Sequence, residues 1–406
     1  MRFLHTADWH LGKKLRLRSR LPEQRAALQQ LGDAAIEHAV DAVLIAGDVY
    51  ESTMPPPEAE QVAFEFLARL SQAGIPSVVI AGNHDQPQRL QALRPLLESL
   101  HIHVRAEVRA PQDGGVVELR SRDGRERALV AALPFVPERK VLDAELVARG
   151  TDEGHVRYAD RIARVLERFD AAFGDDTVNV LLAHLLITGA RFGTGERQLH
   201  LGEIFAIHPE QLPAKAHYAA LGHLHRPQEL PGARCRAAYA GSLVELDFGE
   251  REQQKRAVLV EAHPGAPAQL TDVPLTAGRR LLDVTGTLAS LDQQKDRLGD
   301  AFLRVTVQVP EPTPGIEDKV RALLPCAVEV RQDWPRDPAD VAADAADPAD
   351  APQDPAALFA EFHRREQGTA PPAAMAALFA ELYAEARGDR DDGDGEDRED
   401  REDRDA

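Results

Sequence analysis

The first 275 residues alternate short apolar runs with segments in which apolar residues recur every three or four positions. The apolar runs predict buried strands at 2–6, 42–46, 77–81, 178–182 and 218–221. The periodic segments predict helices at 23–39, 57–73, 87–99 and 155–174, and Pro22-Glu23 is a favourable start for the first. This alternation of strand and helix predicts an α/β sandwich with sheets inside and helices outside. We assign it to residues 1–276.

The pattern changes near Ala277 to a more compact succession of elements. Strand, helix, strand, helix and strand are predicted in turn at 281–285, 288–298, 302–309, 315–324 and 327–330. Residues 277–335 are therefore expected to form a small α+β domain. The Asp/Ala/Pro stretch 336–354 is too polar and too often broken by proline to pack a core, so it is expected to be an acidic linker.

The C-terminal part of the chain contains a short internal repeat. Residues 356–361 and 376–381 both read Ala-Ala-Leu-Phe-Ala-Glu and predict two amphipathic helices, a helical hairpin over 355–388. Such a hairpin buries little surface by itself and needs a partner. The partner is either the chain's own α/β sandwich or a second protein. The apolar side chains that would contact it are Leu358, Phe359, Phe362, Leu378, Phe379 and Leu382.

The net charge of −19 is concentrated in two segments near the C-terminus. Residues 389–406 carry eleven acidic residues against four arginines and are expected to be a disordered tail, and 336–354 carry six aspartates against one arginine. The acidity therefore does not exclude a nucleic-acid ligand. Only Cys235 and Cys326 occur, which fits a reducing cytoplasm. We expect no membrane contact, because no signal peptide and no apolar run of membrane-spanning length is present.

A metal-binding side chain follows each of five apolar runs. The five motifs are Asp8-Trp-His10, Gly47-Asp48, Gly82-Asn83-His84-Asp85, His184 and Gly222-His223-Leu-His225. One such motif alone is weak, since Gly-Asp after a strand is usually an ordinary turn, although Gly-Asn-His-Asp is a stronger signal. Together they predict a shared site for two metal ions, because strand ends converge at one edge of a layered domain. His5 lies inside the first strand and is expected to be a buried, hydrogen-bonded residue.

The chain resembles the calcineurin-like metallophosphoesterases and, among them, the SbcD family of bacterial nucleases. The resemblance rests on MRFLHTADWHLG at 1–12, AALGHLHRPQ at 219–228, YAGSL at 239–243 and FAEFH at 359–363. It implies a four-layer α/β/β/α sandwich with a capping domain that contacts DNA. It also implies that the hairpin docks on the coiled coil of an SbcC-like ABC-type ATPase, and that the chain forms a homodimer within a heterotetramer.

The resemblance assigns a role to each residue of the site. One ion would be bound by Asp8, His10, Asp48 and His225, and the other by Asp48, Asn83, His184 and His223, with Asp48 bridging. The expected ions are Mn, although these ligands also admit Fe, Co or Zn. A hydroxide would attack a phosphodiester while His84 acts as proton donor or stabilises the transition state. Asp85 would either orient His84 or cap the helix that starts at Pro87.

Several cations lie near these motifs and suit contacts to phosphate, although a solvated charged loop is the alternative reading. They are Lys13, Lys14, Arg16, Arg18, Arg20, Arg89 and Arg226. The activity implied is that of a Mn-dependent 3′→5′ double-strand exonuclease and single-strand or hairpin endonuclease in DNA repair, recombination and replication. Two alternatives remain: a phosphodiesterase acting on cyclic nucleotides or phosphoproteins, and a DNA-end tether without catalysis.

Overall fold

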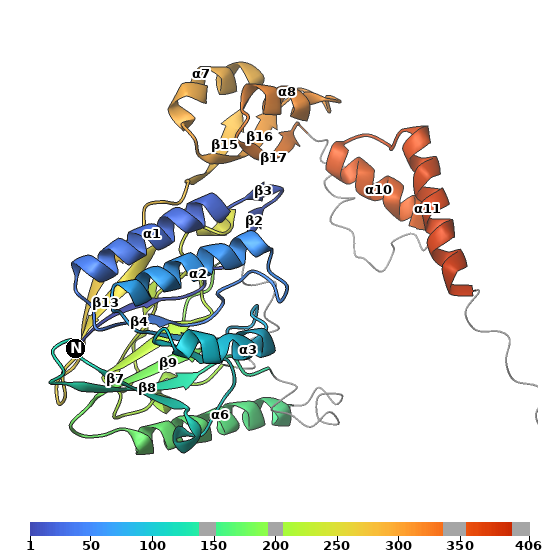
Figure 1. The fold of residues 1–406 in the computed structure, drawn as a ribbon. Coiled ribbons are helices and arrows are strands. Elements are labelled where there is room, and N and C mark those ends of the chain that lie inside the picture. Colours follow the sequence, from blue (N-terminus) through green and yellow to red (C-terminus); the bar gives the residue numbers. More distant parts are fainter. Residues whose placement is uncertain (138–151, 194–205, 336–354, 392–406) are drawn as a thin grey trace, which may run out of the picture. The chain divides into compact units, whose positions relative to one another are not determined.

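The computed structural model describes residues 1–137, 152–193, 206–335 and 355–391. It divides into two compact units: Met1–Asp283 with Asp300–Arg304, and Val284–Gly299 with the chain from Val305 onward. Figure 1 shows the elements of both units and confirms the mixed α/β class. The predicted linker 336–354 and residues 392–406 of the predicted tail lie outside the described residues. No helix in the described ranges is long and apolar enough to cross a membrane.

The first unit contains two six-stranded sheets. The first sheet has the order β14-β13-β1-β4-β5-β6. Strands β1, β4, β5 and β6 run parallel, while β13 and β14 pair antiparallel with their neighbours. Its strands are β1 (Arg2–Thr6), β4 (Ala42–Ile45), β5 (Ser77–Ile80), β6 (Ile102–Arg105), β13 (Arg256–Glu261) and β14 (Gln269–Pro274).

The second sheet has the order β11-β12-β10-β9-β8-β7, and its four middle strands run parallel. Its strands are β7 (Val116–Arg120), β8 (Arg127–Leu133), β9 (Val178–His184), β10 (Tyr218–Gly222), β11 (Gln228–Glu229) and β12 (Arg236–Tyr239). All five strands that the apolar runs predicted are present, three in one sheet and two in the other.

The two sheets stack face to face, with helices on their outer faces. Phe3 and Leu44 of the first sheet share a core cluster with Val180 and Ala220 of the second. The outer face of the first sheet packs against α1 (Leu21–Glu37), α2 (Pro57–Gln72) and α3 (Pro87–Glu98), and that of the second against α6 (Asp152–Ala172). Because both faces of each sheet are covered, the central strands read as continuous apolar runs.

Local sequence explains where these helices begin. The first turns of α1, α2 and α3 each contain a proline, whose fixed φ suits a helix start and whose missing N–H is not needed there. The helices lie within three residues of their predicted positions. His5 is fully buried, and its Nδ1 lies 2.8 Å from the Tyr218 hydroxyl of the other sheet, so the prediction for His5 is confirmed. The basic loop after β1 contains an unpredicted hairpin of β2 (Lys14–Leu15) and β3 (Arg18–Ser19).

The segment 281–333 forms a three-stranded sheet with two helices. Its order is β15-β16-β17, and its elements follow the predicted succession: β15 (Leu281–Gly286), α7 (Leu288–Leu298), β16 (Phe302–Gln308), α8 (Ile316–Leu323) and β17 (Ala327–Asp333). Thr287 caps α7, its hydroxyl accepting a hydrogen bond from Ser290 N.

The two C-terminal helices, α10 (Pro355–Gln367) and α11 (Ala373–Asp391), form a hairpin. The Phe359 and Phe379 rings stack with centroids 4.3 Å apart, so these two side chains join the two helices to each other. The other four predicted contact residues are exposed by 43% to 61%: Leu358, Phe362, Leu378 and Leu382. Helix α11 continues to Asp391, beyond the predicted end at 388.

Candidate metal centre

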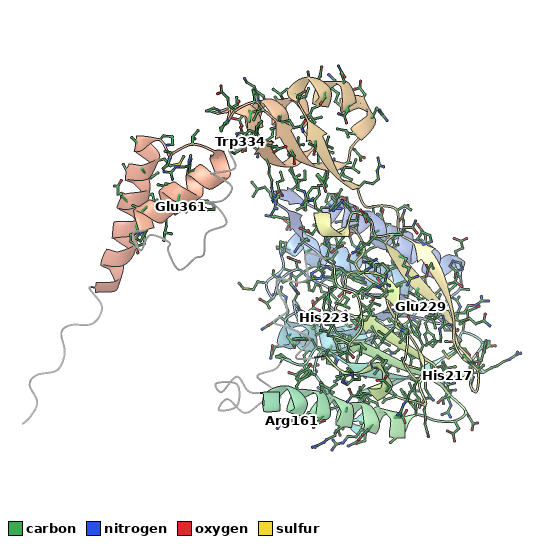
Figure 2. All side chains as sticks on the ribbon, turned by 180° about the vertical axis from the view of Figure 1, so that it is seen from behind. Arg161, His217, His223, Glu229, Trp334 and Glu361 are labelled. Atoms are coloured by element: carbon green, nitrogen blue, oxygen red, sulfur yellow. The ribbon has the colours of Figure 1, made fainter. Side chains whose placement is uncertain are left out.

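The predicted ligands lie at or just after the carboxyl ends of five parallel strands, β1, β4 and β5 in one sheet and β9 and β10 in the other. The two sheets meet here: His223 N donates to Asp8 Oδ1 at 2.9 Å, and His184 Nδ1 lies 2.7 Å from Ala46 O. His223 lies in the interior of the first unit (Figure 2). Stacking of the sheets therefore brings together residues separated by more than two hundred positions in the sequence.

Asp48 lies at the centre of the cluster. Its Oδ2 is 3.6 Å from His10 Nε2 and 3.5 Å from His184 Nε2. Two triads have ligand atoms within 4.8 Å of one another, and Asp48 belongs to both: His10, Asp48 and His84, and Asp8, Asp48 and His184. This position suits a carboxylate shared between two cations.

The remaining predicted ligands border this core. Asn83 Oδ1 lies 3.0 Å from His184 Nε2 and 2.9 Å from His223 Nδ1. The His225 ring lies edge-on to His10 with centroids 4.8 Å apart. The structure thus brings all seven predicted ligand residues into one cluster.

The backbone is strained at this cluster. Asp8, His10, Asp48 and His223 have φ between 46° and 102°, a region that side-chain-bearing residues rarely adopt, and they are four of the seven such residues in the described chain. Two glycines permit the close approach of the loops. A Cβ at Gly82 would collide with the Asp48 carboxylate, and one at Gly222 would collide with Ala46 O. Strain concentrated at buried polar residues indicates a functional site.

Two buried atoms of the cluster lack hydrogen-bond partners among the described residues, Asp8 Oδ2 and His10 Nε2. Burial raises the pKa of Asp8 to about 6 and lowers that of His10 to about 4. Burial would also raise the pKa of Asp48, but the charges of His184 and His10 outweigh it and hold that pKa well below its usual range. Because unpaired buried polar atoms are costly, a carboxylate oxygen and a neutral imidazole nitrogen left in this way fit divalent-cation ligands.

Two glutamates outside the predicted motifs contact predicted ligand histidines at Nδ1, the ring nitrogen that faces away from the cluster. His10 Nδ1 lies 2.9 Å from Glu51 Oε2, and His225 Nδ1 lies 2.9 Å from Glu250 Oε1. A carboxylate at Nδ1 leaves Nε2 directed at the centre. Glu51 stands three residues after Asp48 and could have been suspected, whereas nothing local in the sequence marks Glu250.

His84 borders the centre and is half-buried. Its main-chain N donates to Asp48 Oδ1 at 2.8 Å, and its Nδ1 lies 2.8 Å from Glu51 O. The ring is edge-on to His10 with centroids 4.7 Å apart. Its Nε2 is therefore the nitrogen available to a substrate.

Asp85 has neither of its expected partners. Its carboxylate is buried and accepts hydrogen bonds from the main-chain N–H groups of Gly82, Tyr50 and Val49 at 2.8, 3.0 and 3.2 Å. The α3 N-terminus has no side-chain cap. Asp85 thus ties the loop after β5 to the loop after β4, and its contribution is to hold the two loops that carry Asn83 and Asp48.

The candidate phosphate contacts separate into three groups. Arg20 is fully buried and is bound through two nitrogens to Glu23, so it cannot contact DNA and that prediction is wrong. Lys13 and Arg89 are partly exposed and form ion pairs with Glu51 and Glu60. Lys14, Arg16 and Arg18 are exposed on the β2–β3 hairpin, and Arg226 lines a surface pocket.

Comparison with known proteins agrees with this geometry. The sequence model of the family described as calcineurin-like phosphoesterase matches residues 1–227. The SbcD subunit of the SbcCD nuclease of Bacillus subtilis is 38% identical over 70% of this chain and 71% of its own length. The SbcD subunits from Rhodobacter capsulatus and Escherichia coli K12 are 34% and 30% identical, over 80% of this chain and 84% and 82% of theirs. The chain therefore belongs to the calcineurin-like phosphoesterase family and, within it, to the SbcD subunits of SbcCD nucleases.

Proposed function

We propose that this protein is a Mn-dependent DNA nuclease of the cytoplasm, acting as a 3′→5′ exonuclease on duplex ends and as an endonuclease on single strands and hairpins. The observation that carries the proposal is the centre itself: two triads share Asp48, and the half-buried His84 belongs to one of them. Asp8, His10, Asp48 and His225 would hold one ion, and Asp48, Asn83, His184 and His223 the other. Two bound divalent ions would supply Lewis acidity toward the phosphoryl oxygens and lower the pKa of water.

The chain's own contribution to bond cleavage is assigned to His84. The Glu51 main-chain oxygen, 2.8 Å from Nδ1, fixes the ring so that a proton is exchanged at Nε2. From that nitrogen His84 donates to the leaving 3′-oxygen or stabilises charge on the phosphoryl group. Asp85 acts indirectly, by fixing the loop that carries His84.

The substrate is tested with the full chain, assayed with Mn against Mg, on end-labelled blunt duplexes, hairpins and bis-p-nitrophenyl phosphate. We expect Mn-dependent shortening of the labelled strands from their 3′ ends and cleavage at hairpin tips. Hydrolysis of the chromogenic phosphodiester without DNA cleavage would instead indicate a different phosphodiester substrate. Addition of the SbcC-like ATPase with and without ATP measures whether the partner controls the rate of cleavage.

The exposed β2–β3 hairpin is proposed to contact the phosphate backbone. Lys14→Glu with Arg16→Glu should weaken duplex binding and lower the slope of log affinity against log salt by about 1.8, because each phosphate contact contributes about 0.9. Fluorescence anisotropy across a salt series in EDTA measures this slope without cleavage. The matched control is Arg164→Glu with Arg168→Glu, which reverses two exposed cations on α6, and it should leave the slope unchanged. An equal fall in both variants would assign the effect to overall charge.

The C-terminal hairpin is proposed to bind the SbcC-like ATPase in a heterotetramer built on a nuclease homodimer. Phe362→Asp with Leu382→Asp should abolish co-purification with that partner, because both side chains are more than half exposed and would carry charge into an apolar interface. Cleavage by the isolated nuclease should persist. Glu361→Gln with Glu381→Gln alters exposed polar residues of the same helices and should retain binding. Retained binding by the Asp variant would direct the search for the interface to other surfaces.

A further inference from the structure

A closed network of hydrogen bonds surrounds His225. Its Nδ1 lies 2.9 Å from Glu250 Oε1, and the other oxygen of that carboxylate accepts from Lys255 Nζ at 2.6 Å. Lys255 Nζ also donates to the main-chain oxygen of His225 at 3.0 Å. The chain of contacts thus returns to the residue where it starts and holds both its ring and its backbone.

The ion pair inside this network is almost fully buried, since the Lys255 and Glu250 side chains are only 4% and 3% exposed. Burial of both charges is costly unless the surrounding hydrogen bonds are complete. Here they are well supplied. Ser242 Oγ accepts from Lys255 and shares its proton between Val244 O at 2.9 Å and Glu250 Oε2 at 3.2 Å. Leu246 N donates to the same carboxylate, and Gln253 Oε1 accepts from Lys255 at 2.8 Å.

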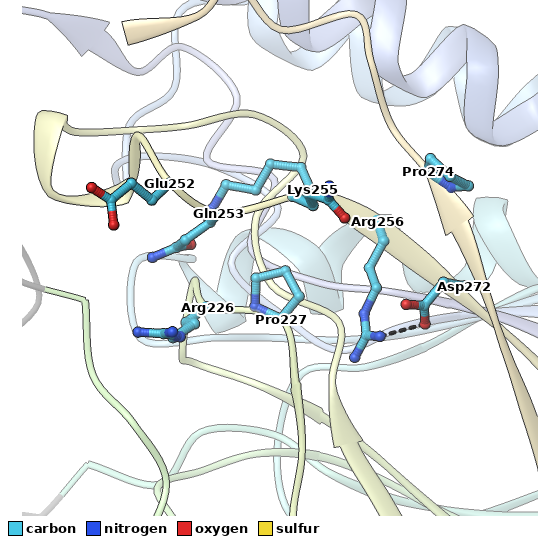
Figure 3. Close-up of a pocket in the computed structure, with 9 residues that line it drawn as sticks. Arg226, Pro227, Glu252, Gln253, Lys255, Arg256, Asp272 and Pro274 are labelled. Carbon is cyan, nitrogen blue, oxygen red and sulfur yellow. Dashed lines mark hydrogen bonds and ion pairs between the residues drawn. The ribbon is translucent and has the colours of Figure 1, made fainter. Parts of the chain in front are cut away.

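The network connects the two sheets of the first unit. His225 follows β10 of the second sheet, while Lys255 immediately precedes β13 of the first sheet. Glu250 ends the short 3-10 helix Phe248–Glu250, which Asp247 caps by accepting from Gly249 N. Lys255 lines a pocket of about 380 Å³ together with Gln253 and Arg226 (Figure 3). His225 is thereby held to an element outside its own sheet.

A second network of the same kind, at His10, is built differently. His10 Nδ1 meets Glu51, and Lys13 binds that carboxylate at 2.7 Å, but Lys13 and Glu51 are 30% and 28% exposed. Water can replace Lys13 there, and exposed ion pairs contribute little. Water has far less access to Lys255. Lys13 therefore serves as a control for Lys255, because each binds a glutamate that contacts a histidine and only Lys255 is almost fully buried.

We propose that Lys255 is a positioning residue for the metal centre. It holds the Glu250 carboxylate and the His225 main chain together, so that the His225 imidazole keeps Nε2 directed at the ion it would bind. The inference rests on the proposed assignment of His225 as a ligand of one of the two ions. Lys255, which does not itself contact the metal ion, then determines how tightly that metal ion binds.

The test is calorimetric titration of Mn²⁺ into the metal-free full chain, comparing wild type, Lys255→Met and Lys13→Met. Residues that hold a metal ligand in place are typically worth about 10–100-fold in metal affinity. Lys255→Met should therefore bind one Mn²⁺ equivalent more weakly by that factor and bind the other with wild-type affinity. Lys13→Met should bind both equivalents within about twofold of wild type, since its partly exposed ion pair contributes little. Excess Mn²⁺ should restore the turnover of Lys255→Met, which loss of folding would not permit.

Three outcomes would overturn the inference. If folded Lys255→Met bound both Mn²⁺ equivalents with wild-type affinity, Lys255 would have no role at the metal site. Equal weakening of both equivalents, or turnover that excess Mn²⁺ does not restore, would make its role purely architectural. If Lys255→Met does not fold, Glu250→Gln, which keeps the side-chain volume, decides by the same criteria. Failure of wild type itself to bind two equivalents would contradict the proposed function instead, so the two failures are distinguishable.

Discussion

Replacing His84 with glutamine should lower the rate of DNA cleavage by about 10²–10⁴-fold, the usual contribution of a positioned proton donor, while both metal ions remain bound. The substitution keeps the main-chain N–H that donates to Asp48 Oδ1 at 2.8 Å, so the shared carboxylate stays in place. It removes the imidazole Nε2, the only nitrogen of His84 left for a substrate once Nδ1 contacts Glu51 O. His84→Ser should behave in the same way.

The measurement combines single-turnover cleavage of a labelled duplex with metal content of the same protein sample. His263→Gln is the control, because this exposed histidine pairs with Glu126 near the amino end of β1, at the opposite edge of the sheet, and should cleave at the wild-type rate. His84 also lies within 4.8 Å of ligand atoms of His10 and Asp48. Loss of one metal equivalent in His84→Gln would therefore make His84 a ligand and contradict its role as proton donor.

Replacing Asp48 with asparagine should weaken both metal equivalents and reduce cleavage by at least about 10³-fold, since metal ions contribute several kcal/mol to the transition state. Asp48 belongs to both triads and lies 3.5 and 3.6 Å from the imidazoles of His184 and His10. Asparagine keeps the size of the side chain but removes its charge. Duplex binding in EDTA should be unchanged, because the proposed phosphate contacts lie elsewhere.

Calorimetric titration of Mn²⁺ and anisotropy in EDTA together measure these two effects. Asp33→Asn is the control, since Asp33 is an exposed carboxylate on α1 paired with Arg69, and it should bind both ions as the wild type does. If Asp48→Asn retained one equivalent at full affinity, Asp48 would serve a single ion. The bridging assignment would then be withdrawn.

Much of the first unit could be predicted because its signals are local. Prolines in the first turn mark the starts of α1, α2 and α3, and apolar runs mark the strands that are buried on both faces of their sheet. The same locality made the candidate ligands recognisable. Asp8, Asp48 and Asn83 follow such runs directly, where polar side chains without partners would be costly.

The predictions that failed concern single side chains whose partners depend on packing. Arg20 stands in a basic loop, yet its guanidinium is buried against Glu23, and one nitrogen donates to the Glu245 main-chain oxygen, a residue distant in sequence. Asp85 follows a candidate catalyst but accepts from main-chain N–H groups of two loops. Phe359 and Phe379 occupy equivalent positions in a repeat, and the stacking of their rings was not foreseen, while their contact with a partner stays a prediction.

The sequence by itself determined which residue types stand at the ends of five strands, and hence that a metal centre for phosphoester chemistry was expected. This information is local, because each motif directly follows its own strand. Only the tertiary structure showed that Asp48 belongs to both triads, that Glu51 and Glu250 contact the His10 and His225 rings, and that Lys255 reaches His225 from the other sheet. Those contacts join residues from separate segments, and stacking of the two sheets sets the distances between them.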